Sequence, residues 1–145
     1  FNVRLLLAGD GERHEELIRV VEQLDLNNKV KFLGNRSDVP IILKSSDVVV
    51  QSSHYEGFGL AALEGMAAGK PVIASDVPGL ADVVKDAGLL FPSGDFKCLA
   101  RLLTKLLSDA DYYKSVAERC MARSKEYDVS VMAKRYTQLY NEALL

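Results

Sequence analysis

The stretch from residue 47 to residue 75, DVVVQSSHYEGFGLAALEGMAAGKPVIAS, decides the expected fold of this chain. Val48–Val50 is a β-branched run typical of a buried strand, and Pro71–Ala74 is a second apolar run of the same kind. Between them, the residues from Gly59 to about Ala68 favour a helix, which Gly69 ends because glycine readily adopts the left-handed cap conformation. The stretch therefore predicts a strand, a helix and a second strand parallel to the first.

The same alternation continues on both sides of this unit. Short apolar runs at 3–8, 29–33 and 88–91 predict further strands. Apolar residues at three- and four-residue spacing predict the remaining helices, which are 12–24, a short helix after Asp38, 80–84, a helix after Asp95, 112–125 and 130–144. The expected N-caps are Asp10 for the first of these helices, Ser37 or Asp38 for the second, and Asp95 for the helix that follows it. Short connections between alternating strands and helices imply right-handed crossovers. We therefore expect an α/β fold with a Rossmann-like, doubly wound parallel sheet covered by helices on both faces.

Length and composition favour one soluble globular domain, residues 1–145. The net charge of -2 and the 48% share of hydrophobic residues give no reason to expect nucleic acid as a partner. Cys98 and Cys120 lack the Cys/His spacing of zinc sites, so reduced thiols and no metal are expected. No apolar run approaches the roughly 20 residues that cross a bilayer, so we expect a cytoplasmic protein. Because the chain starts at Phe1 and enters a strand almost at once, we expect it to be a segment of a longer protein.

Two carboxylates bracket the glycine turn of the central stretch. In parallel α/β sheets, ligands bind beyond the carboxyl ends of the strands, which is where Glu56 lies. Gly57 and Gly59 leave backbone N–H groups open where a helix begins, and this suits an anion such as phosphate. Glu64 has mostly apolar neighbours in the sequence, so we expect an enclosed carboxylate in need of a hydrogen-bonding partner such as a ribose diol. A lone helical Glu is more often an ordinary surface acid, but the two acids and the turn together favour a ligand site.

This stretch resembles the E-x7-E signature of retaining glycosyltransferases of family 4, which have the two-domain GT-B fold. Glu56 and Glu64 are the two acids of the signature, and the resemblance spans Leu5 to about Asp109. The other landmarks of the family occur in the expected order, as Gly9-Asp10-Gly11, Phe32-Leu33-Gly34, Asp38-Val39, Ser46-Asp47-Val48, Gly88-Leu89-Leu90 and Pro92-Ser93-Gly94-Asp95. The resemblance implies that the chain is the C-terminal, nucleotide-sugar-binding half of such an enzyme.

The resemblance also implies a role for each residue of the site. Glu56 is the implied catalytic residue, which contacts hydroxyl groups of the donor sugar and stabilises charge rather than acting as a conventional nucleophile. Glu64 is implied to bind the ribose, and the backbone near Leu33 and Gly34 to face the base. The sugar and the diphosphate are implied to bind Glu56 and the backbone amides of Gly57, Phe58, Gly59 and Leu60.

The implied reaction is hexose transfer with retention of anomeric configuration, through front-face attack in which the leaving diphosphate helps to take the proton of the acceptor. The donor is a nucleoside-diphosphate sugar, with UDP or GDP as the expected nucleotide and no cofactor. The acceptor is a saccharide or a lipid-linked saccharide, bound by a separate N-terminal domain. We expect the context to be bacterial O-antigen or capsule biosynthesis.

Parts of the family pattern are expected to lie outside these 145 residues. They are the N-terminal acceptor domain and the first strand-helix unit of the donor domain, which in the family carries an arginine and a lysine that neutralise the diphosphate. Arg4 and Arg13 do not replace this pair by position. Gly79-Leu80-Ala81-Asp82 stands where the family usually has Gly-Leu-Pro-Glu, which alters a helix cap. We expect the fragment alone to be inactive.

A non-catalytic Rossmann-like module that binds a nucleotide or a protein partner remains the alternative. A dinucleotide-dependent dehydrogenase is disfavoured, because Gly9 and Gly11 lack the third glycine of that fingerprint. His54 beside the first acid is either a ligand contact or an incidental loop residue. The discriminating feature is the conjunction of Glu56 and Glu64, which the non-catalytic alternative does not require.

The last third of the chain is locally basic and rich in tyrosine. A solvated face explains most of the basic residues, although a face of this kind would also suit peripheral association with the anionic inner surface of the cytoplasmic membrane. Packing is the expected role of the tyrosines, with a contact at the membrane edge or between domains as the alternative; they are Tyr112, Tyr113, Tyr127, Tyr136 and Tyr140.

Overall fold

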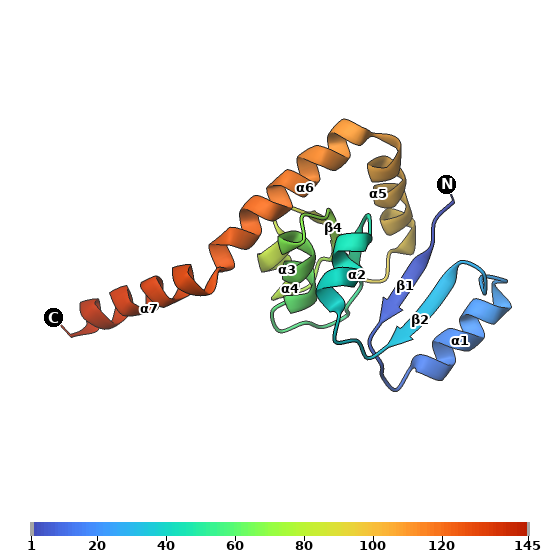
Figure 1. Ribbon diagram of the computed structural model, residues 1–145, viewed down its shortest axis with the longest axis horizontal. Helices are drawn as coiled ribbons and strands as arrows, with labels where there is room; N and C mark the ends of the chain where they lie inside the picture. The colour runs from blue at the N-terminus through green and yellow to red at the C-terminus, as the bar shows by residue number, and fades with distance from the viewer. Residues whose placement is uncertain (1, 145) are drawn as a thin grey trace. The chain divides into compact units, whose positions relative to one another are not determined.

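The computed structural model describes residues 2–144 of the chain, in which helices and parallel strands alternate (Figure 1). The chain divides into two compact units, Phe1–Ile41 and Ile42–Leu145, and each is described here by itself. The predicted α/β class is confirmed. The strands, however, form two hydrogen-bonded sheets of order β1-β2 and β3-β4-β5, where the sequence predicted one.

The first unit is a β-α-β motif followed by the start of α2 (Val39–Ser45). β1 (Leu5–Ala8) and β2 (Val30–Gly34) pair in parallel, with a register shift after Leu7. α1 (His14–Gln23) connects the two strands. None of residues 2–41 is buried.

The cap predicted for α1 is wrong. The helix begins at His14, so its N-cap position is Arg13, whose side chain makes no capping hydrogen bond. Asp10 lies too far upstream, and its carboxylate accepts the N–H of Gly11 at 2.8 Å. Asp38, just before α2, is engaged by two hydrogen bonds from Arg36, which lower the pKa of the Asp38 carboxyl.

The second unit is built around β4 (Val72–Ser75), all of whose residues are buried. β3 (Val49–Gln51) and β5 (Leu89–Phe91) flank it in parallel, with Val49 opposite Val72 and Ile73 opposite Leu89. A strand that is apolar along its whole length suits this central position, because both of its faces are covered.

Helices α3 (Leu60–Ala67), α4 (Leu80–Val84) and α6 (Ala110–Ser124) contact β4, and α5 (Phe96–Ser108) contacts β5. The fully buried side chains at the centre include Met66, Ile73, Leu80, Leu106 and Val116. After α6 the chain makes the short η1 helix (Lys125–Tyr127) and ends in α7 (Val129–Ala143), which has no buried residue.

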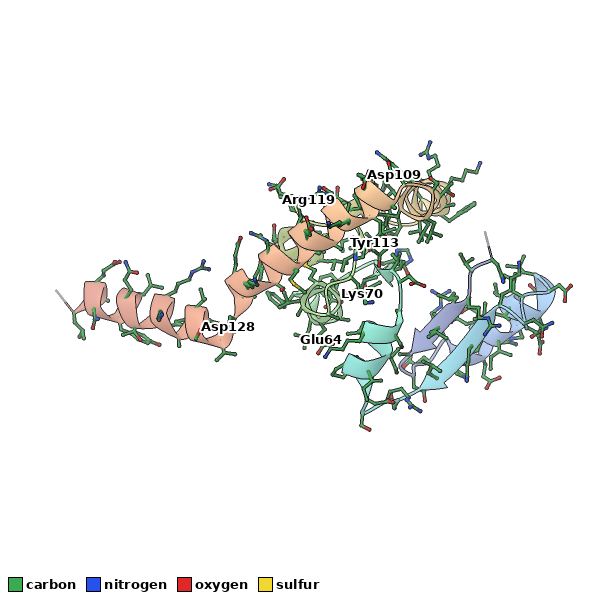
Figure 2. All side chains as sticks on the ribbon, turned by 45° about the horizontal axis from the view of Figure 1, so that its top comes forward. Glu64, Lys70, Asp109, Tyr113, Arg119 and Asp128 are labelled. Carbon is green, nitrogen blue, oxygen red and sulfur yellow. The ribbon has the colours of Figure 1, made fainter. Side chains whose placement is uncertain are left out.

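Aspartates cap the three helices that close the chain. Asp95 accepts the N–H of Cys98 at 2.9 Å, as predicted from the sequence. Asp109 accepts the N–H of Tyr112 at 2.9 Å, and Asp128 accepts the N–H of Ser130 at 2.8 Å (Figure 2). Because Asp109 is a cap, α6 starts at Ala110 rather than at the predicted Tyr112.

The tyrosines and arginines of this region differ in their surroundings. Tyr113 on α6 packs against the core as predicted, and its hydroxyl donates to the carbonyl oxygen of Asp47 at 2.7 Å (Figure 2). The packing role is wrong for Tyr136 and Tyr140 of α7, which are 55% and 66% exposed. Arg123 is held against α4, because its guanidinium donates to the carbonyl oxygen of Asp82 at 2.8 Å.

Within residues 2–144, no helix combines the length and apolar character that a membrane span requires.

The two cysteines are expected to differ sharply in reactivity. Cys120 is fully buried on α6, and burial raises the pKa of its thiol, whereas Cys98 is partly exposed on α5. Iodoacetamide should label Cys98 in the native protein and should label Cys120 only after unfolding, as followed by mass spectrometry. Equal labelling rates in the native protein would contradict the packing of α6.

Candidate functional site

The loop of residues 52–59, between β3 and α3, packs closely against the turn between β4 and α4. Gly79 in that turn has φ 79°, and a Cβ atom there would lie 2.5 Å from the carbonyl oxygens of both Glu56 and Gly57. Gly59 has φ 94°, and a Cβ atom there would lie 2.7 Å from Leu80 Cδ1. Both positions therefore favour glycine, because another residue would be strained at a positive φ, and at Gly79 its Cβ would also collide with backbone carbonyl groups of the loop.

The base of the loop is held by a buried hydroxyl. Ser75, the last residue of β4, is fully buried, and its hydroxyl donates to the carbonyl oxygen of Ser53, while the carbonyl oxygen of Gln51 lies 3.4 Å from the same Oγ. A buried polar group must be hydrogen-bonded to be tolerated, and here the bond also fixes the path of the chain as it leaves β3.

Glu56 is partly buried and is held by one side chain. Gln51, the last residue of β3, donates from Nε2 to Glu56 Oε2 at 2.6 Å. No hydrogen bond to Glu56 Oε1 comes from any residue in the described range, so this oxygen can accept a hydrogen bond from a ligand. The sequence did not single out Gln51; the only signal is a polar residue at the end of an otherwise apolar strand.

The backbone amides that follow Glu56 are open in the sense that they are unpaired within the described residues; Gly57, Phe58, Leu60 and Ala61 are exposed, whereas Gly59 is buried. None of the N–H groups from Gly57 to Ala61 donates to an acceptor among residues 2–144. The next two are satisfied, since the Ala62 N–H donates to Gln51 Oε1 at 3.0 Å and the Leu63 N–H donates to the Gly59 carbonyl oxygen at 3.0 Å. Open amides at the positive end of a helix dipole form a favourable environment for an anion.

Glu64 is exposed, so the enclosed setting predicted from its apolar neighbours is wrong (Figure 2). α3 buries its other face, which carries Ala62, Gly65 and Met66, and Gly65 brings the helix close to Val49. Glu64 lies one turn beyond Leu60, roughly 6 Å along the helix axis, and side chains on a helix lean toward its N-terminus. Glu64 therefore lies on an accessible face of α3, about one helical turn beyond the open amide of Leu60.

Comparison with known proteins identifies the family. A family model described as "Glycosyl transferases group 1" matches residues 2–123. The chain belongs to this family.

The glycosyl transferase family assignment is supported by curated relatives. N-acetyl-alpha-D-glucosaminyl L-malate synthase of Bacillus anthracis is 32% identical over 148 residues, which cover 99% of this chain and 38% of that protein. An N,N'-diacetylbacillosaminyl-diphospho-undecaprenol alpha-1,3-N-acetylgalactosaminyltransferase of Campylobacter jejuni is 32% identical over 117 residues, covering 79% of this chain and 31% of that protein. The chain thus spans well under half the length of these relatives.

Solved structures of glycosyltransferases agree with the fold. Anabaena Alr3699/HepE has been solved in complex with UDP-glucose and with UDP, and is 30% identical to this chain over 97% of its length and 41% of that protein. The TM-scores are 0.88 for the UDP-glucose complex and 0.90 for the UDP complex. The predicted Rossmann-like, C-terminal half of a GT-B glycosyltransferase is therefore confirmed as the fold class.

Two side-chain contacts connect the loop of residues 52–59 to other parts of the second unit. The ring of Phe58, 44% exposed, meets the ring of Tyr127 edge to face, with centroids 5.6 Å apart. His54 Nδ1 lies 2.9 Å from Ser93 Oγ, beyond the end of β5, so this histidine already has a protein partner. The sequence left the role of His54 open and gave no sign of the Phe58 contact.

Leu33 and Gly34, predicted to face the base, belong to the first unit. Gly34 ends β2 with φ 61°, and its carbonyl oxygen accepts the Gly9 N–H at 2.8 Å. Their role, like the roles of Glu56, Gly57 to Leu60 and Glu64, stays a prediction. Within residues 2–144, no group of three or more His, Cys, Asp or Glu side chains could hold a metal ion.

The packing of the loop of residues 52–59 against the turn after β4 can be tested by substitution of Gly79. Gly79→Ala should destabilise the protein by about 2–4 kcal/mol, because the positive φ alone costs about 1–3 kcal/mol and the clash with the two carbonyl groups adds to it. Gly57→Ala is the matched control, since no atom lies within 4 Å of an added Cβ there. Urea unfolding measures both variants. Equal stability of the two would show that the turn does not constrain the loop.

Proposed function

We propose that the loop of residues 52–59 and the start of α3 form the donor site of a glycosyltransferase that uses a nucleoside-diphosphate sugar. The observation that carries this proposal is the occurrence, side by side in the chain, of open amides from Gly57 to Ala61 and of a carboxylate, Glu56, with one oxygen that has no partner among residues 2–144. The amides suit the diphosphate, and the free oxygen suits a sugar hydroxyl. Membership of the glycosyl transferases group 1 family supports this function over a non-catalytic module.

The diphosphate is the group that the amides recognise. It carries negative charge, and backbone N–H groups at a helix N-terminus bind such charge without the desolvation cost of a buried lysine. As the bond to the sugar breaks, negative charge grows on the diphosphate. Donors that are already in place stabilise this charge in the transition state, which lowers the barrier.

Glu56 is proposed to position the sugar. Its free Oε1 accepts a hydrogen bond from a sugar hydroxyl, while Oε2 is occupied by Gln51. A negative carboxylate near the anomeric carbon also stabilises the positive charge that develops there. We assign the reaction as hexose transfer with retention, in which the departing diphosphate takes the proton of an acceptor that attacks from the same face.

Glu64 is proposed to bind the ribose of the nucleotide. Glu64 is exposed, lies about one helical turn beyond the open amide of Leu60 and has no hydrogen-bonding partner among residues 2–144, so both oxygens of its carboxylate can accept from a diol. Because the carboxylate is in contact with solvent, keeping it charged costs less desolvation free energy than it would in the enclosed setting that the sequence suggested.

The remaining parts of the enzyme are proposed to lie outside residues 1–145. The Anabaena complexes with UDP and UDP-glucose support a UDP-sugar as the first donor to test. The Campylobacter relative is named for an acceptor linked to undecaprenyl diphosphate, which supports a saccharide or lipid-linked saccharide acceptor and a role in bacterial polysaccharide assembly. No metal is proposed, and association with the membrane surface would be peripheral.

Glu56→Gln in the intact enzyme should lower turnover at least about tenfold, because an interaction made in the transition state is weakened. The Kd for UDP should stay within about twofold, because Glu56 is assigned to the sugar and not to the nucleotide. Glu118→Gln, an exposed acid on α6 paired at 4.0 Å with Lys114, is the matched control and should keep wild-type turnover. Wild-type turnover in Glu56→Gln would defeat the assigned role.

Glu64→Ala should raise the Kd for UDP about tenfold, since hydrogen bonds to a charged acceptor are lost. Inorganic pyrophosphate has no ribose, so its Kd should not change. Isothermal titration calorimetry of the intact enzyme measures both. If the substitution weakened pyrophosphate as much as UDP, Glu64 would be acting on the phosphates or on the fold rather than on the ribose.

A further inference from the structure

Gln51 joins the two halves of the proposed site through one side chain. Its Nε2 donates to Glu56 Oε2 at 2.6 Å, and its Oε1 accepts the Ala62 N–H at 3.0 Å. Only this orientation of the side-chain amide satisfies both neighbours, because the reversed amide would place its oxygen against the carboxylate and its NH2 against an N–H group. The contacts therefore fix the amide in a single orientation.

The position of Gln51 is itself well determined. It ends β3 and pairs with Ala74 of β4, and its carbonyl oxygen lies 3.4 Å from Ser75 Oγ. The side chain is partly buried beside the start of α3. A residue held at the edge of a sheet can transmit that rigidity to a loop residue that it contacts, and Glu56 lies on such a loop.

The chemistry of an amide suits this task. A lysine or arginine in the same place would form an ion pair with Glu56 and offset the charge that the proposed mechanism uses. An aliphatic side chain would leave the carboxylate free to rotate. A glutamine donates one hydrogen bond, fixes one oxygen and leaves Glu56 negative with its second oxygen free to accept from a ligand.

We propose that Gln51 is a positioning residue that holds Glu56 in the orientation needed to bind the donor sugar, in register with the open amides at the start of α3. The inference rests on the proposed function of Glu56. It goes further in predicting that Gln51 affects recognition of the sugar and not of the nucleotide.

The test uses Gln51→Met in the intact enzyme, which keeps the length of the side chain and removes its hydrogen bonds with Glu56 and Ala62, together with the long one to Ser53 Oγ at 3.5 Å. Calorimetry gives the Kd for UDP-glucose and for UDP, with GDP-mannose and GDP as the second pair if the wild type prefers them. The nucleotide-sugar Kd should rise about fivefold to tenfold, and the Kd for the nucleotide alone should stay within about twofold. Gln23→Met, at the exposed end of α1, is the matched control and should change neither.

A second variant separates the two hydrogen bonds. Gln51→Glu keeps an acceptor for the Ala62 N–H but places a carboxylate against Glu56. The Gln51→Glu variant should bind the nucleotide sugar more weakly at pH 8, because two negative carboxylates then face each other. Part of the affinity should return as the pH falls, because one proton shared by the two carboxyl groups restores a hydrogen bond to Glu56. A pH-independent affinity equal to that of the wild type would show that only the Ala62 contact matters, and would overturn the proposal.

A double-mutant cycle shows whether Gln51 acts through Glu56. In a Glu56→Ala background, Gln51→Met should have no further effect on the nucleotide-sugar Kd, because there is no carboxylate left to position. If Glu56→Ala weakens sugar binding and Gln51→Met does not, the positioning role is wrong and the proposed function stands. Two outcomes would overturn the proposed function itself, and this inference with it. One is that the wild type binds no nucleotide sugar. The other is that Glu56→Ala leaves unchanged the ratio of the Kd for the nucleotide sugar to the Kd for the nucleotide alone.

Discussion

The close approach of the Gly79 backbone to the carbonyl groups of Glu56 and Gly57 is the constraint on which the site depends. A side chain at Gly79 would collide with both carbonyl oxygens at 2.5 Å. The contact limits how closely the loop can approach the turn after β4. It also affects where α3 starts, because the left-handed Gly59 at the end of the loop is the N-cap of that helix. Two glycines thus determine where a carboxylate and a row of open amides lie.

Hydrogen bonds refine what the backbone contact fixes. Ser75 anchors the loop where it leaves β3, and Gln51 connects that strand to both Glu56 and α3. Within the described part of the chain, the groups that a ligand would use keep no hydrogen-bond partner, namely Glu56 Oε1 and the amides from Gly57 to Ala61. A site whose own groups are held in place before binding loses less entropy when a ligand arrives.

The helices and strands of the fold could be predicted from the sequence, but the face that each helix buries could not. Short β-branched runs and glycine or aspartate boundaries are local signals, so β3, β4 and the Asp95 cap could be predicted. Glu64 could not be placed, because α3 is apolar nearly all round and only tertiary packing decides that Ala62 and Met66 face inward. The Gln51–Glu56 contact depends on the path of a loop, which no periodicity encodes. The Asp109 cap was missed because the predicted helix start lay too far downstream.

The central claim is that one loop holds both the diphosphate and the sugar of the donor. A crystal structure of the intact enzyme with UDP-glucose tests it directly. The account predicts diphosphate oxygens within hydrogen-bonding distance of amides between Gly57 and Ala61, and a glucose hydroxyl on Glu56 Oε1 with the bond from Gln51 preserved. A diphosphate bound elsewhere, with these amides facing solvent and Glu56 more than 4 Å from any sugar hydroxyl (beyond the ~2.7–3.2 Å of a hydrogen bond), would contradict it.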